Sequence, residues 1–257
     1  MSTFFDLGES SIAERFVSPD VNYSDLSTAD PRTIIEFAAQ TIDRLAVATS
    51  FQSSGLVILH LLRDVRPELP ILFMDTGFHF PETLEFKERI RDLWDLKLVE
   101  LRGDHGSAQR QAEIYGPKLY ERDPDRCCFI NKVRPLQNAL EEYDGWISGL
   151  RSDQSPLRTE TPVIEAQLLP SGNEILKIHP LARWSRDHVN DYIATNAIPT
   201  HPLLERGYAS IGCWPCTRAV TPGEPERAGR WDGLGKTECG IHSFGKPDGP
   251  RETEAEQ

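Results

Sequence analysis

The chain has 257 residues and a mass of 29.0 kDa, and its 28 basic and 40 acidic side chains give a formal net charge of −12. Apolar residues make up 39% and charged residues 26% of the sequence, which is typical of a folded globular protein and excludes wholesale disorder. An acidic balance argues against a nucleic-acid or membrane partner, since both need a broad basic surface. We expect one large domain with an appendage.

The N-terminal part of the sequence is acidic. Its first ten residues carry neither the basic nor the apolar region of a secretory signal, and the apolar run 56–62 is too short to cross a bilayer, so we expect a cytoplasmic protein. The first 43 residues hold eight acids against two arginines. We predict a solvated, helical appendage over residues 1–30 that takes part in self-association, and hence a homo-oligomer.

Helices and strands alternate along the following part of the chain. Asp30 and Pro31 combine an N-cap acid with a proline at the first helical position, which predicts a helix that begins there. The next predicted elements are a strand over 45–49, a helix over 56–65, a strand over 69–74, a helix over 81–94 and a strand over 96–101. This alternation indicates a Rossmann-like, doubly wound α/β fold with a mostly parallel sheet.

The second half of the sequence is less regular. We predict helices over 109–119 and 125–143, the latter interrupted at Pro135, a strand over 145–149, a hairpin formed by 162–169 and 174–178, and a helix after Ser185. From Ala197 onward glycine, proline and arginine dominate. We expect a core over about 44–200, a loop-rich region over about 201–242 that folds around a metal or a ligand, and a flexible tail over 243–257.

Two loops follow predicted strands, and parallel sheets bind ligands beyond the carboxyl ends of their strands. The first loop contains Ser50, Phe51, Gln52, Ser53 and Ser54. Small hydroxyl residues before a helix leave backbone N–H groups free for a phosphate, although an ordinary turn is the alternative. The second loop contains Asp75, Thr76 and Gly77, which could bind an adenine or a ribose or form a simple turn.

The five cysteines divide into four and one. Cys127 and Cys128 are adjacent, and Cys213 and Cys216 form a Cys-x-x-Cys pair, which together predict a four-thiolate metal site for zinc or an iron–sulfur cluster. Cys239 lies near Lys236 and His242, where a thiol can have a lowered pKa and act as a nucleophile. An exposed, inert thiol is the alternative for Cys239.

Arginines and polar residues gather in two segments. The first contains Arg151, Asp153, Gln154, Ser155 and Arg158, and the second contains Arg218, Arg227 and Arg230. Arginine grips phosphate and sulfate through paired hydrogen bonds, although surface ion pairs would explain any single one of these. Lys132 follows Cys128 by four residues, so on a helix it shares that face and presents a cation between the thiols and an anion.

Several segments occur together in one family. SFQSSGLVILHLL, MDTGFHFPET, CCFINKVRPLQNAL, WISGLRSDQSPLR, GYASIGCWPCTR and KTECGIH follow one another along the chain. The sequence resembles the assimilatory adenylyl-sulfate (APS) and 3′-phosphoadenylyl-sulfate (PAPS) reductases, and its four paired cysteines resemble the APS-reducing branch. The stretch INKV resembles the PAPS-reducing branch, so PAPS and dual specificity stay open as alternatives.

The resemblance implies a reductase domain over 31–242 with a fold like that of the adenine nucleotide alpha-hydrolases. It implies one [4Fe-4S] cluster per subunit, held by Cys127, Cys128, Cys213 and Cys216. It also implies that Cys239 attacks the sulfur of APS, releases AMP and becomes an S-sulfocysteine, from which thioredoxin or glutaredoxin releases sulfite. Such an enzyme serves sulfate assimilation and cysteine biosynthesis, with Lys132, Arg227, Arg230 and His242 as further catalytic residues.

Two other classes of protein remain as alternatives. An iron–sulfur transferase that uses ATP, such as a tRNA-thiolating enzyme, needs a Ser-Gly-Gly-x-Asp-Ser type of loop, which residues 50–55 lack. A non-catalytic zinc- or cluster-binding module would explain the four paired cysteines but not Cys239 or the arginines.

Overall fold

The fold is built on one sheet of seven strands in the computed structural model, which describes residues 5–6 and 23–244. The strands are β1 (Phe5–Asp6), β2 (Leu45–Ala48), β3 (Ile71–Met74), β4 (Leu98–Leu101), β5 (Gly145–Ser148), β6 (Ile164–Leu168) and β7 (Glu174–Ile178). Their order across the sheet is β1-β6-β7-β5-β2-β3-β4, and only the β6–β7 pair is antiparallel among the described strands. The predicted mostly parallel α/β fold and the predicted hairpin are confirmed.

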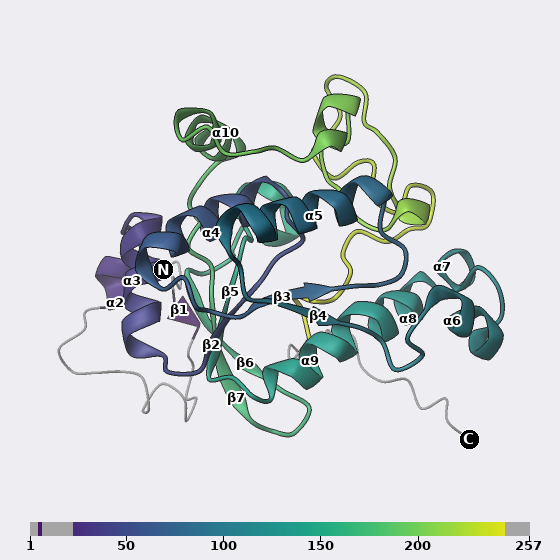
Figure 1. Cartoon of the computed structure of the whole chain (residues 1–257), viewed down its shortest axis with the longest axis horizontal. Coiled ribbons are helices and arrows are strands. Elements are labelled where there is room, and N and C mark those ends of the chain that lie inside the picture. Colours follow the sequence, from purple (N-terminus) through teal and green to yellow (C-terminus); the bar gives the residue numbers. More distant parts are fainter. Residues whose placement is uncertain (1–4, 7–22, 245–257) are drawn as a thin grey trace.

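Helices cover both faces of this sheet (Figure 1). They are α2 (Tyr23–Leu26), α3 (Pro31–Thr41), α4 (Ser53–Val65), α5 (Pro81–Trp94), α6 (Ala108–Tyr115), α7 (Leu119–Arg122), α8 (Pro124–Cys128), α9 (Arg134–Leu140) and α10 (Arg186–Thr195). Successive strand residues point to opposite faces. Val47 and Phe73 therefore pack in one buried cluster with α3, α4, α5 and α10, whereas Ala46 and Trp146 pack in a second with Leu136 of α9.

Side-chain caps set two helix starts where the sequence predicted them. The Asp30 carboxylate accepts hydrogen bonds from the backbone N–H groups of Arg32 at 2.9 Å and Thr33 at 3.3 Å. At the start of α10, Ser185 and His188 exchange hydrogen bonds in a capping box. These bonds satisfy N–H groups that have no partner within the helix.

The structure corrects three predicted boundaries. Helix α4 begins at Ser53, so the first loop is shorter than expected. The helix predicted over 109–119 ends at Tyr115, before Gly116 with its positive φ of 81°. The helix predicted over 125–143 continues through a π-helical turn, Phe129–Val133, into α9. A wider turn accommodates the ring and the missing N–H of Pro135 in the next helical turn.

The two ends of the chain lie partly outside the described residues. Of the predicted helical appendage, Phe5–Asp6 is instead a strand paired with β6, Tyr23–Leu26 is one helical turn, and residues 1–4 and 7–22 are not described. Phe244 is fully buried in the same cluster as Trp146, so the folded chain continues past the predicted boundary at 242. None of the described helices has the length and apolarity that a membrane span requires.

Candidate active site

A cavity of about 190 Å³ opens at the carboxyl ends of β2, β3 and β5, where a parallel sheet is expected to bind its ligand. Twelve of the predicted site residues line it: Ser50, Gln52, Ser53, Ser54, Lys132, Arg151, Gln154, Arg158, Arg227, Arg230, Cys239 and His242. The other predicted catalytic and substrate-binding residues, Phe51, Asp75, Thr76, Gly77, Asp153, Ser155 and Arg218, lie outside its lining. The chain therefore brings the cysteine of the C-terminal region to the same cavity as the first loop.

The turn between β2 and α4 forms one wall of the cavity. The Thr49 hydroxyl accepts a hydrogen bond at 3.0 Å from the backbone N–H of Phe51, whose φ is 55°. The Phe51 ring is fully buried and meets the Phe73 ring edge-on, so this residue belongs to the core. Ser53 and Ser54 occupy the first turn of α4, where helix N–H groups point toward the cavity end of the sheet and favour an anion.

Gln52 joins that turn to the loop before the Cys-x-x-Cys pair. Its amide oxygen accepts from the backbone N–H of Ile211 at 2.7 Å, and its amide nitrogen donates to the Ile211 carbonyl at 2.8 Å. The same nitrogen donates to the Ser50 hydroxyl at 2.8 Å. Gln52 therefore fixes the distance between two walls of the cavity, a role that its place in the sequence did not reveal.

Arg151 is buried, and its guanidinium is already bound by protein groups. It donates to the Ser54 hydroxyl at 2.7 Å, to Asp153 at 2.8 Å and to Glu226 at 2.8 Å. Asp153 also accepts from the backbone N–H of Arg186 at the start of α10. Arg151 therefore ties the first turn of α4 to the C-terminal region and is not a free cation.

Arg158 and Arg227 share one carboxylate. Glu238 receives two hydrogen bonds from Arg158, at 2.8 and 2.6 Å, and one from Arg227 at 3.1 Å. Burial lowers the pKa of Arg227 to about 10. Sequence reasoning missed Glu238, although it directly precedes Cys239.

Two cations face the cavity and form no ion pair with a carboxylate of the described chain: Lys132 and Arg230. Burial by itself would lower the pKa of Lys132, but the neighbouring Cys213, Cys128 and Cys239, in their thiolate forms, raise it above its ordinary value. Arg230 lies 4.4 Å above the ring of Trp231. These two charges give the cavity a cationic character within an acidic protein, which favours an anionic ligand.

His242 lies at the far side of the same cavity. Its ring stacks on Trp146 with 6.0 Å between centroids, and its Nδ1 atom is buried without a hydrogen-bond partner. Burial, with the nearby Lys177 and Arg158, lowers its pKa well below the ordinary value, so the imidazole is neutral. Ser155 has a buried hydroxyl that likewise lacks a partner.

A second, smaller cavity is lined by Cys127, Cys128, Cys213 and Cys216, and it shares Lys132 with the first. Cys128 and Cys216 pack in one buried cluster with Trp231, and the backbone at His79, after β3, bridges to Cys213. Burial raises the pKa of Cys127 to about 11 and that of Cys128 to about 12, so both thiols stay protonated unless a metal binds them.

Polar groups reach two of these sulfurs. The Thr76 hydroxyl lies 3.3 Å from Cys213 Sγ, so Thr76 contacts a thiol, whereas His79 of the same loop lines the first cavity. The buried Asn131 amide donates to Cys127 Sγ at 3.5 Å, to the Cys127 carbonyl at 2.8 Å and to the Gln111 side chain at 2.6 Å. Asn131 therefore orients the thiol of Cys127.

The four paired cysteines could bind either a zinc ion or an iron–sulfur cluster. In the part of the chain that the structure describes, no three His, Cys, Asp or Glu side chains converge closely enough to bind one ion. A single zinc ion needs its thiolates about 2.3 Å from one centre, whereas an iron–sulfur cluster binds each thiolate at a different iron. Four thiols spread around one small cavity fit the cluster better than zinc.

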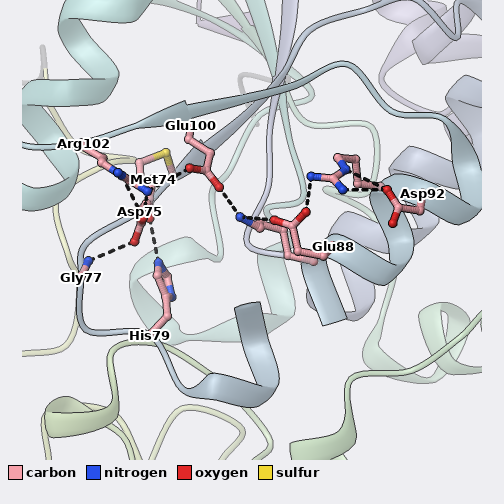
Figure 2. Close-up of polar contacts among 10 residues, drawn as sticks. Met74, Asp75, Gly77, His79, Glu88, Asp92, Glu100 and Arg102 are labelled. Carbon is pink, nitrogen blue, oxygen red and sulfur yellow. Dashed lines mark hydrogen bonds and ion pairs between the residues drawn. The ribbon is translucent and has the colours of Figure 1, made fainter. Parts of the chain in front are cut away.

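Two predicted site regions have structural partners instead. Figure 2 shows Asp75 held by Arg102, with a shortest distance of 2.8 Å, and by the backbone N–H of Gly77 at 3.1 Å. His79 in the same turn donates to the Met74 carbonyl at 2.8 Å (Figure 2). Arg218 binds Glu224 and Asp232 outside the first cavity. The geometry thus gives no support to substrate binding by Asp75, Gly77 or Arg218.

Comparison with known proteins identifies the family. The phosphoadenosine phosphosulfate reductase domain matches residues 44–219. An adenosine 5′-phosphosulfate reductase of Streptomyces coelicolor is 42% identical over 85% of this chain and 90% of its own length. A phosphoadenosine 5′-phosphosulfate reductase of Gloeobacter violaceus is 40% identical over 83% and 88%. The crystal structure of phosphoadenylyl-sulfate (PAPS) reductase from Candida auris, a phosphate complex, superposes with a TM-score of 0.68 at 30% identity over 84% of this chain and 98% of that one. This chain therefore belongs to the phosphoadenosine phosphosulfate reductase family.

Proposed function

We propose that this protein is a reductase that converts APS to sulfite and AMP in sulfate assimilation, with thioredoxin or glutaredoxin as the reductant. The observation that carries the proposal is the position of Cys239, which lines the cavity together with Lys132, Arg227 and Arg230. The names of relatives such as the Streptomyces coelicolor protein support APS as the substrate. PAPS is the second candidate, because the Gloeobacter violaceus relative is named for it.

The proposed reaction has two steps. The Cys239 thiolate attacks the sulfur of APS, the bond from that sulfur to the bridging oxygen breaks, and AMP leaves with the oxygen. A thiol of the reductant then attacks Sγ of the S-sulfocysteine, so sulfite leaves with the bonding pair and a mixed disulfide forms. The second thiol of the reductant resolves the mixed disulfide and frees Cys239. Lys132 and Arg230 stabilise the phosphate of AMP as it gains charge.

We further propose that Cys127, Cys128, Cys213 and Cys216 hold one [4Fe-4S] cluster per subunit. When bound, the cluster supplies a fixed charge distribution beside the substrate cavity. Lys132 lines both cavities and so links this charge to the anion. The cytoplasmic location and the homo-oligomer remain predictions of the sequence.

A comparison of two substrates tests the proposal. We expect sulfite release from APS with reduced thioredoxin, and Cys239→Ser to lower that rate by at least about a thousandfold while the protein keeps its brown colour. Cys213→Ser should lose colour and activity together. A variant at Cys239 with full activity would refute the assigned nucleophile, a colourless protein with one zinc ion would refute the cluster, and faster turnover of PAPS would assign that substrate instead.

A further inference from the structure

The residue before the nucleophile occupies two of the arginines of the cavity. Glu238 takes a bidentate pair of hydrogen bonds from Arg158, at 2.8 and 2.6 Å, and a third from Arg227 at 3.1 Å. Arg227 also donates to the backbone carbonyl of Thr237 at 2.8 Å. The segment that carries Cys239 is thus held by the two guanidinium groups through both side chain and backbone.

This arrangement is the one by which arginine binds phosphate and sulfate. A planar guanidinium pairs two N–H groups with two oxygens of a carboxylate or of a tetrahedral oxyanion alike. Arg158 and Arg227 both line the cavity, so an anion in the cavity and the Glu238 carboxylate would compete for the same donors. Both side chains are largely buried, Arg158 at 10% and Arg227 at 15% exposed, so leaving either charge unpaired is costly.

The contact of Glu238 with Arg158 and Arg227 can open while the chain beyond Cys239 stays in place. Beyond Cys239, Lys177 donates to the His242 carbonyl and Gln167 to the Phe244 carbonyl, each at 3.1 Å, and Phe244 is fully buried. Gly235 and Gly240, on either side of Cys239, have positive φ values of 66° and 91°. Besides Glu238, three contacts hold the intervening segment: the Arg227 hydrogen bond to the Thr237 carbonyl, an ion pair between Lys236 and the exposed carboxylate of Asp125, and packing of Cys239 against Trp231 and its cluster.

We propose that Glu238 is an internal counter-anion and a positioning residue for Cys239. In the free protein its carboxylate neutralises Arg158 and Arg227 and holds the segment 236–240 on the cavity. The sulfate or phosphate group of an entering ligand displaces it, and the segment that carries Cys239 then turns between its glycines from this anchored position to one from which Cys239 reaches the bound ligand. The inference relies on the proposed function for the role of Cys239, but the contact itself does not depend on turnover.

Binding of AMP and of inorganic sulfate to the complete protein tests this exchange. Glu238→Gln removes the competing charge at nearly constant shape, so calorimetry should show about tenfold tighter binding of the anion that uses these arginines. Glu160→Gln removes an exposed carboxylate of the same region and should change either affinity less than about twofold. Glu238→Asp keeps the charge on a shorter side chain, so its affinity for the anion should lie between those of Glu238→Gln and Glu160→Gln.

Alkylation of Cys239 by iodoacetamide, followed by mass spectrometry of its peptide, gives a second readout. In the natural chain AMP or sulfate should accelerate alkylation several-fold, whereas Glu238→Gln should react fast without either anion. Equal anion affinities in Glu238→Gln and Glu160→Gln, or alkylation of the natural chain that neither anion changes, would overturn the proposal. Both readouts work without turnover, so absence of sulfite release from APS would count against the proposed function alone.

Discussion

At the scale of single residues, the partner of each charge decides what that charge can do. Arg151 and Arg230 have the same side chain and line the same cavity. Arg151 is bound by Asp153 and by Glu226, which is 75 positions away, whereas Arg230 donates only to uncharged groups of the described chain, the Ser210 hydroxyl and the Ile211 carbonyl. A sequence cannot separate these roles, because the distant partner is chosen by the fold.

Asn131 is a buried residue whose removal should be measurable. Asn131→Ala would leave the Gln111 side chain and the Cys127 carbonyl without their donor, and we expect it to lower the free energy of unfolding by about 1–3 kcal/mol in urea. Asn138→Ala on the exposed side of α9 is the matched control, and it should lower the free energy of unfolding by less than about 0.5 kcal/mol. Equal losses in the two variants would show that the buried amide contributes no specific stability.

At the scale of elements, local patterns explain most boundaries. Short buried runs set the central strands, and side-chain caps set the starts of α3 and α10. The π-helical turn before α9 was not predicted, because a π turn has no short sequence signature and is stabilised by its surroundings. That turn belongs to the candidate site, since it contains Lys132, which lines both cavities, and Asn131, which contacts Cys127.

The turn between β2 and α4 depends on the absence of a side chain at Gly55. A Cβ atom at Gly55 would overlap the Thr49 hydroxyl, which holds the backbone of Phe51. We expect Gly55→Ala to lower the free energy of unfolding by about 1–3 kcal/mol. In a Thr49→Ala background the hydroxyl is gone, so the added cost of Gly55→Ala should fall below about 1 kcal/mol. Additive losses in this double-mutant cycle would contradict the steric explanation.

At the scale of the whole molecule, burial of histidines links stability to pH. Burial is the largest cause of a lowered pKa for His60, His79, His105, His201 and His242. The unfolded chain therefore binds more protons than the folded one below about pH 6.5, and acid destabilises the fold. The five histidines lie on both faces of the sheet and at the cavity. The stability lost in acid is therefore a property of the whole fold rather than of one helix or strand.

His201 gives the sharpest test of that linkage. It is fully buried, with hydrogen bonds to Thr83 at 3.0 Å and from the backbone N–H of Leu203 at 3.2 Å, and burial lowers its pKa to about 4. From pH 7 to pH 5 its share of the lost stability should be about 2 kcal/mol. Urea unfolding of His201→Gln should be less pH-dependent by that amount than urea unfolding of the natural chain. An unchanged slope in His201→Gln would contradict a neutral, buried His201.

The sequence by itself determined the fold class, the helix caps, the two cysteine pairs and the candidate nucleophile. These depend on residues close together in the chain, where periodicity and spacing are visible. Only the tertiary structure decided that Gln52 binds Ile211, that Asp75 binds Arg102, and that Glu238 occupies Arg158 and Arg227. Such contacts join segments far apart in the sequence, and their energies depend on burial and on competing partners. The net charge predicted that the chain binds no nucleic acid over a broad surface. The positive charge of the cavity was visible only in the fold, which left Lys132 and Arg230 without a carboxylate among the described residues.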